Sequence, residues 1–121
     1  MNPNKNFFPL DKFMYEALYN QKNGFYMKKN PFGSKGDFIT SPNISILFSE
    51  MLSIWTISFW KNVKSPKEIN LIELGAGNGQ MIYDMMNSLK RFPEFYKSCK
   101  FIILEKSPYL KKIQKKKLKN F

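Results

Sequence analysis

The segment Ile69-Asn-Leu-Ile-Glu-Leu-Gly-Ala-Gly-Asn-Gly79 decides the fold of this chain. Its first six residues form a short, bounded apolar run with β-branched members, which is typical of a buried strand. Three glycines follow at alternate positions, and a helix is expected next, with one side formed by Met81, Ile82, Met85, Met86 and Leu89. Such a strand, turn and helix can cradle a cofactor, because glycines permit positive φ and let backbone N–H groups approach a ligand closely.

The same alternation of elements continues downstream. Phe101–Leu104 is a second apolar run of strand length. Ser107-Pro108 opens another amphipathic segment, whose inner side is expected at Leu110, Ile113 and Leu118. Residues 69–118 therefore predict a β-α-β-α unit and an α/β fold.

The glycine spacing and two carboxylates indicate the class of ligand. A dinucleotide fingerprint reads Gly-x-Gly-x-x-Gly, but Gln80 occupies its last position and the third glycine arrives one residue early, at Gly79. Glu73 would repel a pyrophosphate, whereas it would attract an ammonium or sulfonium group. Glu105, at the tip of the second strand, can accept hydrogen bonds from both hydroxyls of a ribose. The pattern favours a cationic nucleoside without phosphates.

Each of these features has a simpler interpretation. The glycines could form an ordinary tight turn between a strand and a helix. Glu73 could satisfy nearby helix N–H groups, and Glu105 could be an exposed strand end. The ligand hypothesis therefore depends on the two carboxylates and the glycine turn occurring together.

Upstream of this unit, the sequence predicts mainly helices. A short amphipathic helix is expected where apolar residues recur at helical spacing, at Leu10, Phe13, Met14, Ala17 and Leu18. Phe25–Met27 is apolar enough for a brief strand, and residues 30–36 indicate a loop. A second helix is expected from Ser41, which can cap it, with Pro42 in its first turn, to Trp60. Its apolar stripe is so wide that we expect this helix to pack on more than one side.

Composition and charge narrow the function classes. The chain has 121 residues, which allows one domain, and 43% of them are apolar, which is enough for a core. The absence of His excludes His-based triads, proton shuttles and His-ligated metal sites, and the single Cys cannot form an internal disulfide. No targeting signal or membrane-spanning run is apparent, so we expect a soluble intracellular protein. The net charge of +11 is concentrated in residues 90–121, which hold 11 basic and 2 acidic residues.

Two stretches resemble a known family. Glu73-Leu-Gly-Ala-Gly-Asn-Gly79 is similar to the first motif of class I S-adenosylmethionine-dependent methyltransferases, with Glu105 at the ribose-binding acid of that fold. Gly36-Asp-Phe-Ile-Thr-Ser-Pro42 resembles the MidA-like family, which includes the mitochondrial complex I assembly methyltransferase. The similarity spans about residues 8–118, and Gly36–Pro42 is its most specific part.

The resemblance implies an incomplete fold. The complete family fold is a seven-stranded Rossmann-like sheet, and this chain stops after the helix that follows its second strand. We therefore expect residues 1–66 to form a helical N-terminal extension with a family-specific loop at 33–43. Residues 67–121 would form the first β-α-β-α of the S-adenosylmethionine-binding domain, with an unpaired sheet edge.

The resemblance also implies a function and a set of site residues. The cofactor would be S-adenosyl-L-methionine, and the methyl acceptor an arginine side chain of a protein, for the mitochondrial members a complex I subunit. No metal and no membrane insertion are implied, and the location would be a bacterial cytoplasm or a mitochondrial matrix. Asp37 is the only acidic residue of the family-specific loop, and we hypothesise that it orients cofactor or acceptor as the catalytic carboxylate. The cofactor-binding residues would be Gly36, Phe38, Thr40, Ser41, Glu73, Gly75, Ala76, Gly77, Gly79 and Glu105.

Departures from the family pattern leave alternatives open. Asn43 and Asn78 stand where the family usually has Glu and Arg, and Ala76 and Ser49 replace Pro and Gly. Because the chain is short, we expect it to be inactive alone, and a non-catalytic interaction module is an alternative. A second alternative is a basic nucleic-acid-binding domain that uses the lysines of residues 111–119, although such runs are usually solvated helix faces.

Overall fold

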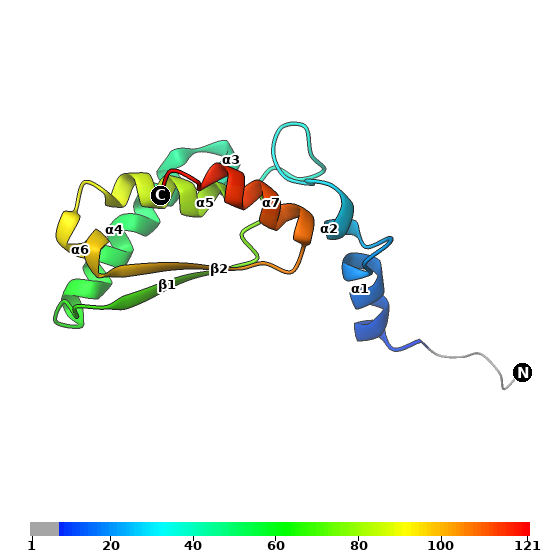
Figure 1. Ribbon diagram of the computed structural model, residues 1–121, viewed down its shortest axis with the longest axis horizontal. Helices are drawn as coiled ribbons and strands as arrows, with labels where there is room; N and C mark the ends of the chain where they lie inside the picture. Colours follow the sequence, from blue (N-terminus) through cyan, green and yellow to red (C-terminus); the bar gives the residue numbers. More distant parts are fainter. Residues whose placement is uncertain (1–7) are drawn as a thin grey trace, which may run out of the picture.

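The computed structural model describes residues 8–121 as a mixed α/β fold (Figure 1). Strands β1 and β2 pair in parallel, with Ile69 opposite Cys99 and Leu74 opposite Leu104. Within the described residues the other edge of β1 has no partner strand, which agrees with the expected incomplete sheet. In chain order the elements are α1 (Leu10–Tyr19), α2 (Phe25–Lys28), α3 (Ser41–Ile44), α4 (Ile46–Asn62), β1 (Ile69–Leu74), α5 (Gln80–Leu89), α6 (Pro93–Ser98), β2 (Cys99–Leu104) and α7 (Pro108–Lys117).

The core lies where α4, α5 and α6 meet. Its buried members are Ile57, Trp60, Met85, Leu89 and Phe95. The rings of Trp60 and Phe95 meet edge to face with centroids 5.3 Å apart. The Trp60 indole N–H donates to a backbone carbonyl in the loop before β1, at 2.9 Å, so its polar atom is satisfied. This core holds the helices against the amino-terminal halves of both strands, where Ile69, Leu71, Cys99 and Phe101 pack on it.

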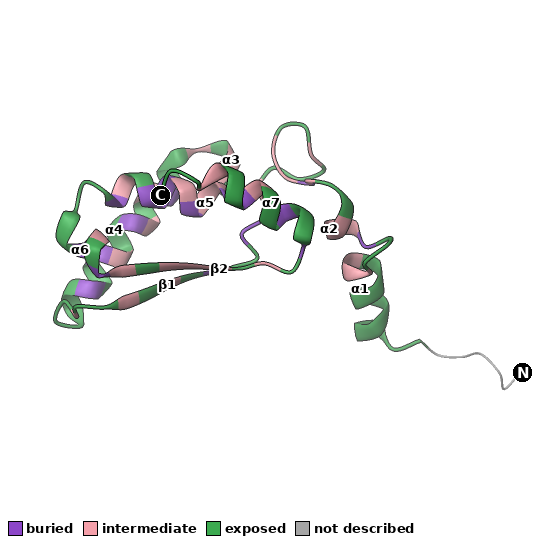
Figure 2. Cartoon of the chain, in the orientation of Figure 1, coloured by how far each residue is buried: buried purple, intermediate pink, exposed green. Residues whose placement is uncertain are grey.

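Helix α4 buries one side only, so the prediction that it packs on more than one side is wrong for this chain (Figure 2). Its buried side is formed by Ser49, Ser53, Ile57 and Trp60. The two small serines let α4 approach α5 closely, and the Ser53 hydroxyl donates to the Ser49 carbonyl at 2.8 Å. Much of the apolar stripe faces outward instead, and its exposed members are Leu47, Phe48, Met51, Ile54, Trp55 and Phe59.

The predicted helix from Ser41 is interrupted at Ser45. Ser45 is extended, with φ −149° and ψ 133°, and its side chain accepts a hydrogen bond from the Leu47 N–H at 3.2 Å. Ser45 is therefore the N-cap of α4, whereas Ser41 begins the separate short helix α3. A serine hydroxyl competes with the helix for backbone N–H groups, which accounts for the break.

Two further elements differ from the sequence prediction. Phe25–Met27 lies in α2 and is not a strand. Residues 8–121 offer it no partner strand, and the Met27 N–H closes a turn on the Gly24 carbonyl at 3.0 Å. The short helix α6 was not predicted. It begins at Pro93, whose fixed φ suits a first helical position, and β2 consequently begins at Cys99.

Candidate cofactor site

The glycine turn joins the end of β1 to the start of α5. Gly75, Gly77 and Gly79 have φ of 65°, 54° and 73°, the left-handed region that favours glycine. The Gly75 N–H donates to the Leu104 carbonyl at 2.8 Å, so the turn is attached to the end of β2. The predicted strand, turn and helix are thus confirmed, and the carboxyl ends of both strands meet at this turn (Figure 1).

The turn carries free hydrogen-bond donors. Within residues 8–121, the backbone N–H groups of Ala76, Gly77 and Asn78 have no acceptor. All three residues line one cavity, together with Gly75 and Glu73. Backbone donors that lie free beside a cavity are available to a bound molecule.

Glu73 is the charged group of this cavity. Its side chain is 9% exposed, and its Oε2 has no hydrogen-bond partner among the described residues. Burial raises the pKa of Glu73 to about 7, and the backbone amide of Ile82 opposes this rise. A buried carboxylate oxygen without a partner is costly, and a cationic group in the cavity would remove that cost.

The cavity itself is small. Its volume is about 150 Å³, and its other lining residues are Phe32, Thr40, Pro42, Asn43, Gln80 and Met81. Sites that enclose a whole drug-sized molecule usually measure roughly 300–1,000 Å³. The cavity can therefore hold one end of a nucleoside ligand, and the remainder would lie across the turn.

Glu105 lies just after β2, beside the same turn but outside the cavity of Glu73. Its Oε1 accepts hydrogen bonds from the N–H groups of Lys106 and Ser107, at 2.8 and 2.9 Å. Among residues 8–121, its Oε2 meets only the side-chain amide of Gln114, at 3.4 Å. Glu105 thus stabilises the start of α7 with one oxygen and keeps the other for a further donor. It lines a separate hollow of about 420 Å³, with Gln114 among its walls.

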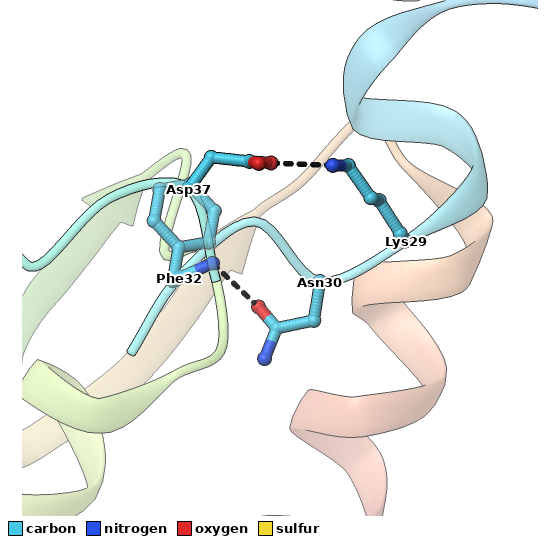
Figure 3. Close-up of polar contacts among 4 residues, drawn as sticks. All are labelled: Lys29, Asn30, Phe32 and Asp37. Carbon is cyan, nitrogen blue, oxygen red and sulfur yellow. Dashed lines mark hydrogen bonds and ion pairs between the residues drawn. The ribbon is translucent and has the colours of Figure 1, made fainter. Parts of the chain in front are cut away.

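The N-terminal loop contributes only one of its predicted residues to the cavity, namely Thr40. Asp37 forms an ion pair with Lys29, at 2.6 Å, and both side chains are about half exposed (Figure 3). The backbones of Gly36 and Phe38 close the loop on itself through bonds to the Gly33 and Pro31 carbonyls. The structure therefore does not bring Asp37, Gly36, Phe38 or Ser41 to the wall of the Glu73 cavity.

Sequence reasoning missed the residues that connect this loop to the glycine turn. Asn78 donates its side-chain amide to Asn43 Oδ1 at 3.0 Å, and Asn43 donates to Thr40 Oγ1 at 3.1 Å. Phe32 packs directly over the turn, where a Cβ at Gly77 would lie 2.9 Å from its ring. Both asparagines had been noted in the sequence as departures from the pattern that the resemblance implies, but no local signal indicated their contact.

Residues 8–121 present neither a metal-binding cluster nor a membrane-spanning helix. No group of three or more Cys, Asp or Glu side chains there is placed to hold a metal ion. None of the helices there combines the length and apolar character that crossing a bilayer requires.

Three curated proteins show the similarity in sequence. Over 88% of this chain, the sequence is 40% identical to "Protein arginine methyltransferase NDUFAF7 homolog, mitochondrial" of Drosophila melanogaster. Over 90% of this chain it is 39% identical to the NDUFAF7 protein of Xenopus laevis. Over 85% of this chain it is 37% identical to the NDUFAF7 protein of Homo sapiens. It spans only about a quarter of their length, between 24% and 25%.

A solved structure shows the similarity in fold. The crystal structure of a Burkholderia thailandensis protein bound to S-adenosyl-homocysteine superposes with a TM-score of 0.79 at 23% identity, over 93% of this chain and 29% of the other. In addition, residues 51–121 match the model of a family described as "Putative S-adenosyl-L-methionine-dependent methyltransferase". This match includes β1, the glycine turn, α5, β2 and α7, and the chain therefore belongs to that methyltransferase family.

Proposed function

We propose that the chain carries the S-adenosyl-L-methionine site of a protein arginine methyltransferase, as the N-terminal part of a longer enzyme. The observation that carries this proposal is the buried, unpartnered Glu73 Oε2 beside a glycine turn with three free N–H groups. A carboxylate and backbone donors in one cavity suit the ammonium and carboxylate of an amino acid. Under this proposal, residues 67–121 begin the cofactor-binding domain and residues 1–66 are its extension.

The remaining predicted residues fit the rest of that cofactor. Glu105 Oε2, which accepts a long bond of 3.4 Å from Gln114, can still accept a ribose hydroxyl, and the hollow beside it can accept the nucleoside end. Thr40 lines the amino-acid end, and Gly36, Phe38 and Ser41 belong to the loop that leads into it. When bound, S-adenosylmethionine supplies a methyl group that its sulfonium already activates. The protein then has mainly to orient the reactants and to exclude water.

The proposed acceptor and location rest on the relatives. The relatives are named protein arginine methyltransferases and mitochondrial, so we propose an arginine side chain of a partner protein as acceptor. For a eukaryotic protein we propose the mitochondrial matrix and a complex I subunit as the partner. For a bacterial protein we propose the cytoplasm.

Titration of S-adenosylhomocysteine into the 121-residue chain tests the cofactor site. We expect saturable binding by calorimetry, weakened by about 1–3 kcal/mol in Glu105→Ala, because that change leaves a ribose hydroxyl without its acceptor. Glu94→Ala, at an exposed carboxylate in the first turn of α6, serves as control and should bind as the native chain does. Equal affinities of Glu105→Ala and the native chain would remove Glu105 from the site.

Asp37 is proposed as the carboxylate that orients the guanidinium of the acceptor. Its ion pair with Lys29 is exposed, so a positively charged acceptor can compete for it with little desolvation (Figure 3). In a full-length protein that contains this chain, Asp37→Ala should lower the methylation rate and leave S-adenosylhomocysteine affinity unchanged, because Asp37 lies outside the cofactor cavity. Unchanged methylation would exclude this role.

A non-catalytic interaction module is the second candidate function. It is favoured by the unpaired edge of β1 and by the exposed apolar side of α4, which Trp55 and Phe59 extend as a stacked pair with centroids 5.9 Å apart. Such surfaces are typical of sites that another protein segment covers. Absence of S-adenosylhomocysteine binding by a folded chain would favour this candidate over the first.

A further inference from the structure

Gln114 is a buried glutamine that lines the hollow beside Glu105 and that the proposed site has so far given no other role. It lies on α7 and is 4% exposed. Its Nε2 donates to the carbonyl of Gly77 at 2.8 Å and reaches Glu105 Oε2 at 3.4 Å. One amide group therefore contacts the glycine turn and the ribose-binding candidate at the same time.

The shorter contact fixes the direction of a peptide in the turn. In a trans peptide the carbonyl of Gly77 and the N–H of Asn78 point in opposite directions. Because Gln114 holds that carbonyl, the Asn78 N–H is directed away from α7. This N–H has no acceptor within residues 8–121, and Asn78 lines the cavity that contains Glu73.

The longer contact concerns the free oxygen of Glu105. The other oxygen already accepts two backbone N–H groups, so the carboxylate is anchored on that side. Gln114 provides the only protein donor to Oε2 among the described residues. At 3.4 Å this bond is longer than usual, which leaves the oxygen able to accept a stronger bond from a ligand.

Close packing holds Gln114 in this place. A Cβ built on Gly79 would lie 3.2 Å from Gln114 Cγ, a distance that is tight for such a contact. The absence of a side chain at Gly79 therefore lets α7 bring the amide to the turn. The first α7 turn is fixed independently, because Ser107 accepts from the Leu110 N–H at 3.2 Å.

We propose that Gln114 is a positioning residue that couples the two ends of the cofactor site. It aims the Asn78 N–H at the amino-acid end and sets the free oxygen of Glu105 at the ribose end. Binding at one end thus organises the other, because both depend on the same amide. The inference rests on the proposed function, since it takes S-adenosylmethionine as the ligand.

A double-mutant cycle tests this coupling. Gln114→Met keeps the length and the packing against Gly79 but removes the donor, and it is made in the native chain and in Glu105→Ala. We expect S-adenosylhomocysteine to bind about tenfold more weakly to Gln114→Met than to the native chain. In the Glu105→Ala background the same change should cost about threefold or less, because residues that act through one another are not additive.

Controls separate positioning from folding. Lys112→Leu, on the exposed side of α7, should leave the affinity unchanged, and thermal unfolding checks that every variant is folded. Gln114→Asn shortens the side chain by one methylene and should also weaken binding. This variant keeps the test available if Gln114→Met does not fold.

The outcomes distinguish the inference from the function on which it rests. No binding by the folded native chain overturns the proposed function and this inference with it. Native binding with no effect of Gln114→Met overturns the inference alone. An equal loss of affinity in the native and Glu105→Ala backgrounds also overturns the inference, because Gln114 would then have a packing role that does not act through Glu105.

Discussion

Gly77→Ala should weaken S-adenosylhomocysteine binding at least tenfold more than the same substitution at Gly75. Both positions have φ near +60°, so both alanines carry a backbone cost of about 1–2 kcal/mol. Only at Gly77 does the new methyl group collide, because its Cβ would lie 2.9 Å from the Phe32 ring. At Gly75, apart from the two neighbouring residues in the chain, no described residue has an atom within 4 Å of the built Cβ. The pair therefore separates backbone strain from the loss of close approach.

The collision should affect the cavity because Phe32 is one of its walls. The ring of Phe32 is stacked on Tyr26 with an interplanar angle of 9°, so its displacement also disturbs the N-terminal segment. Calorimetry and thermal unfolding of both variants measure the two effects. Gly77→Ala should lose more stability than Gly75→Ala. The double variant Phe32→Ala/Gly77→Ala should recover this additional loss. Equal losses at the two glycines would show that Phe32 does not pack on the turn.

The β-α-β-α unit could be predicted because its signals are local. The six-residue apolar run, the alternate glycines and the helical spacing after Gln80 each lie within a few residues of the element that they specify. The position of Glu73 followed from them, since a residue at the end of β1 must lie beside the turn. Its burial and missing partner could not be predicted, because they depend on how Phe32 and the α3 segment cover the cavity.

The orientation of α4 shows what periodicity alone cannot decide. Apolar residues are present on several sides of this helix, so it was expected to pack on more than one side. The structure buries Ser49 and Ser53 instead, because two small side chains allow a closer contact with α5 than large ones. The sequence pattern is compatible with burial of either face of α4. The shape of the neighbouring helix α5 determines which face is buried.

Contacts between distant segments were the other missing information. The Asn78 to Asn43 hydrogen bond joins residues 35 positions apart, and the Gln114 to Gly77 bond joins residues 37 apart. No local pattern specifies such pairs. For the same reason the motif Gly36–Pro42 indicated the loop but not which of its residues line the cavity; Thr40 and Pro42 do.

Glu73→Gln should have opposite effects on stability and on binding. Because the folded pKa of Glu73 is about 7 and the ordinary pKa of a glutamate is 4.5, the folded state holds this proton more tightly than the unfolded state. The contribution of Glu73 to stability is therefore fully present below pH 4.5, declines as the pH rises, and is lost above about pH 7. Glutamine keeps the shape but does not ionise. The variant should match the native chain near pH 4.5 and unfold at a higher temperature at pH 8.

Binding should change in the other direction, because the ionised carboxylate is what a ligand ammonium needs. Removing one partner of a buried charge pair costs about 3–5 kcal/mol, so Glu73→Gln should lose about 100-fold or more in S-adenosylhomocysteine affinity at pH 8. The native affinity should rise between pH 6 and 8 as Glu73 ionises, and the affinity of the variant should not change with pH.

Glu68→Gln, at an exposed carboxylate just before β1, should change neither stability nor binding. A variant that binds as tightly as the native chain would mean that the ligand's cationic end does not enter this cavity. A variant that gains no stability at pH 8 would mean that burial does not destabilise the ionised Glu73 carboxylate in the ligand-free chain.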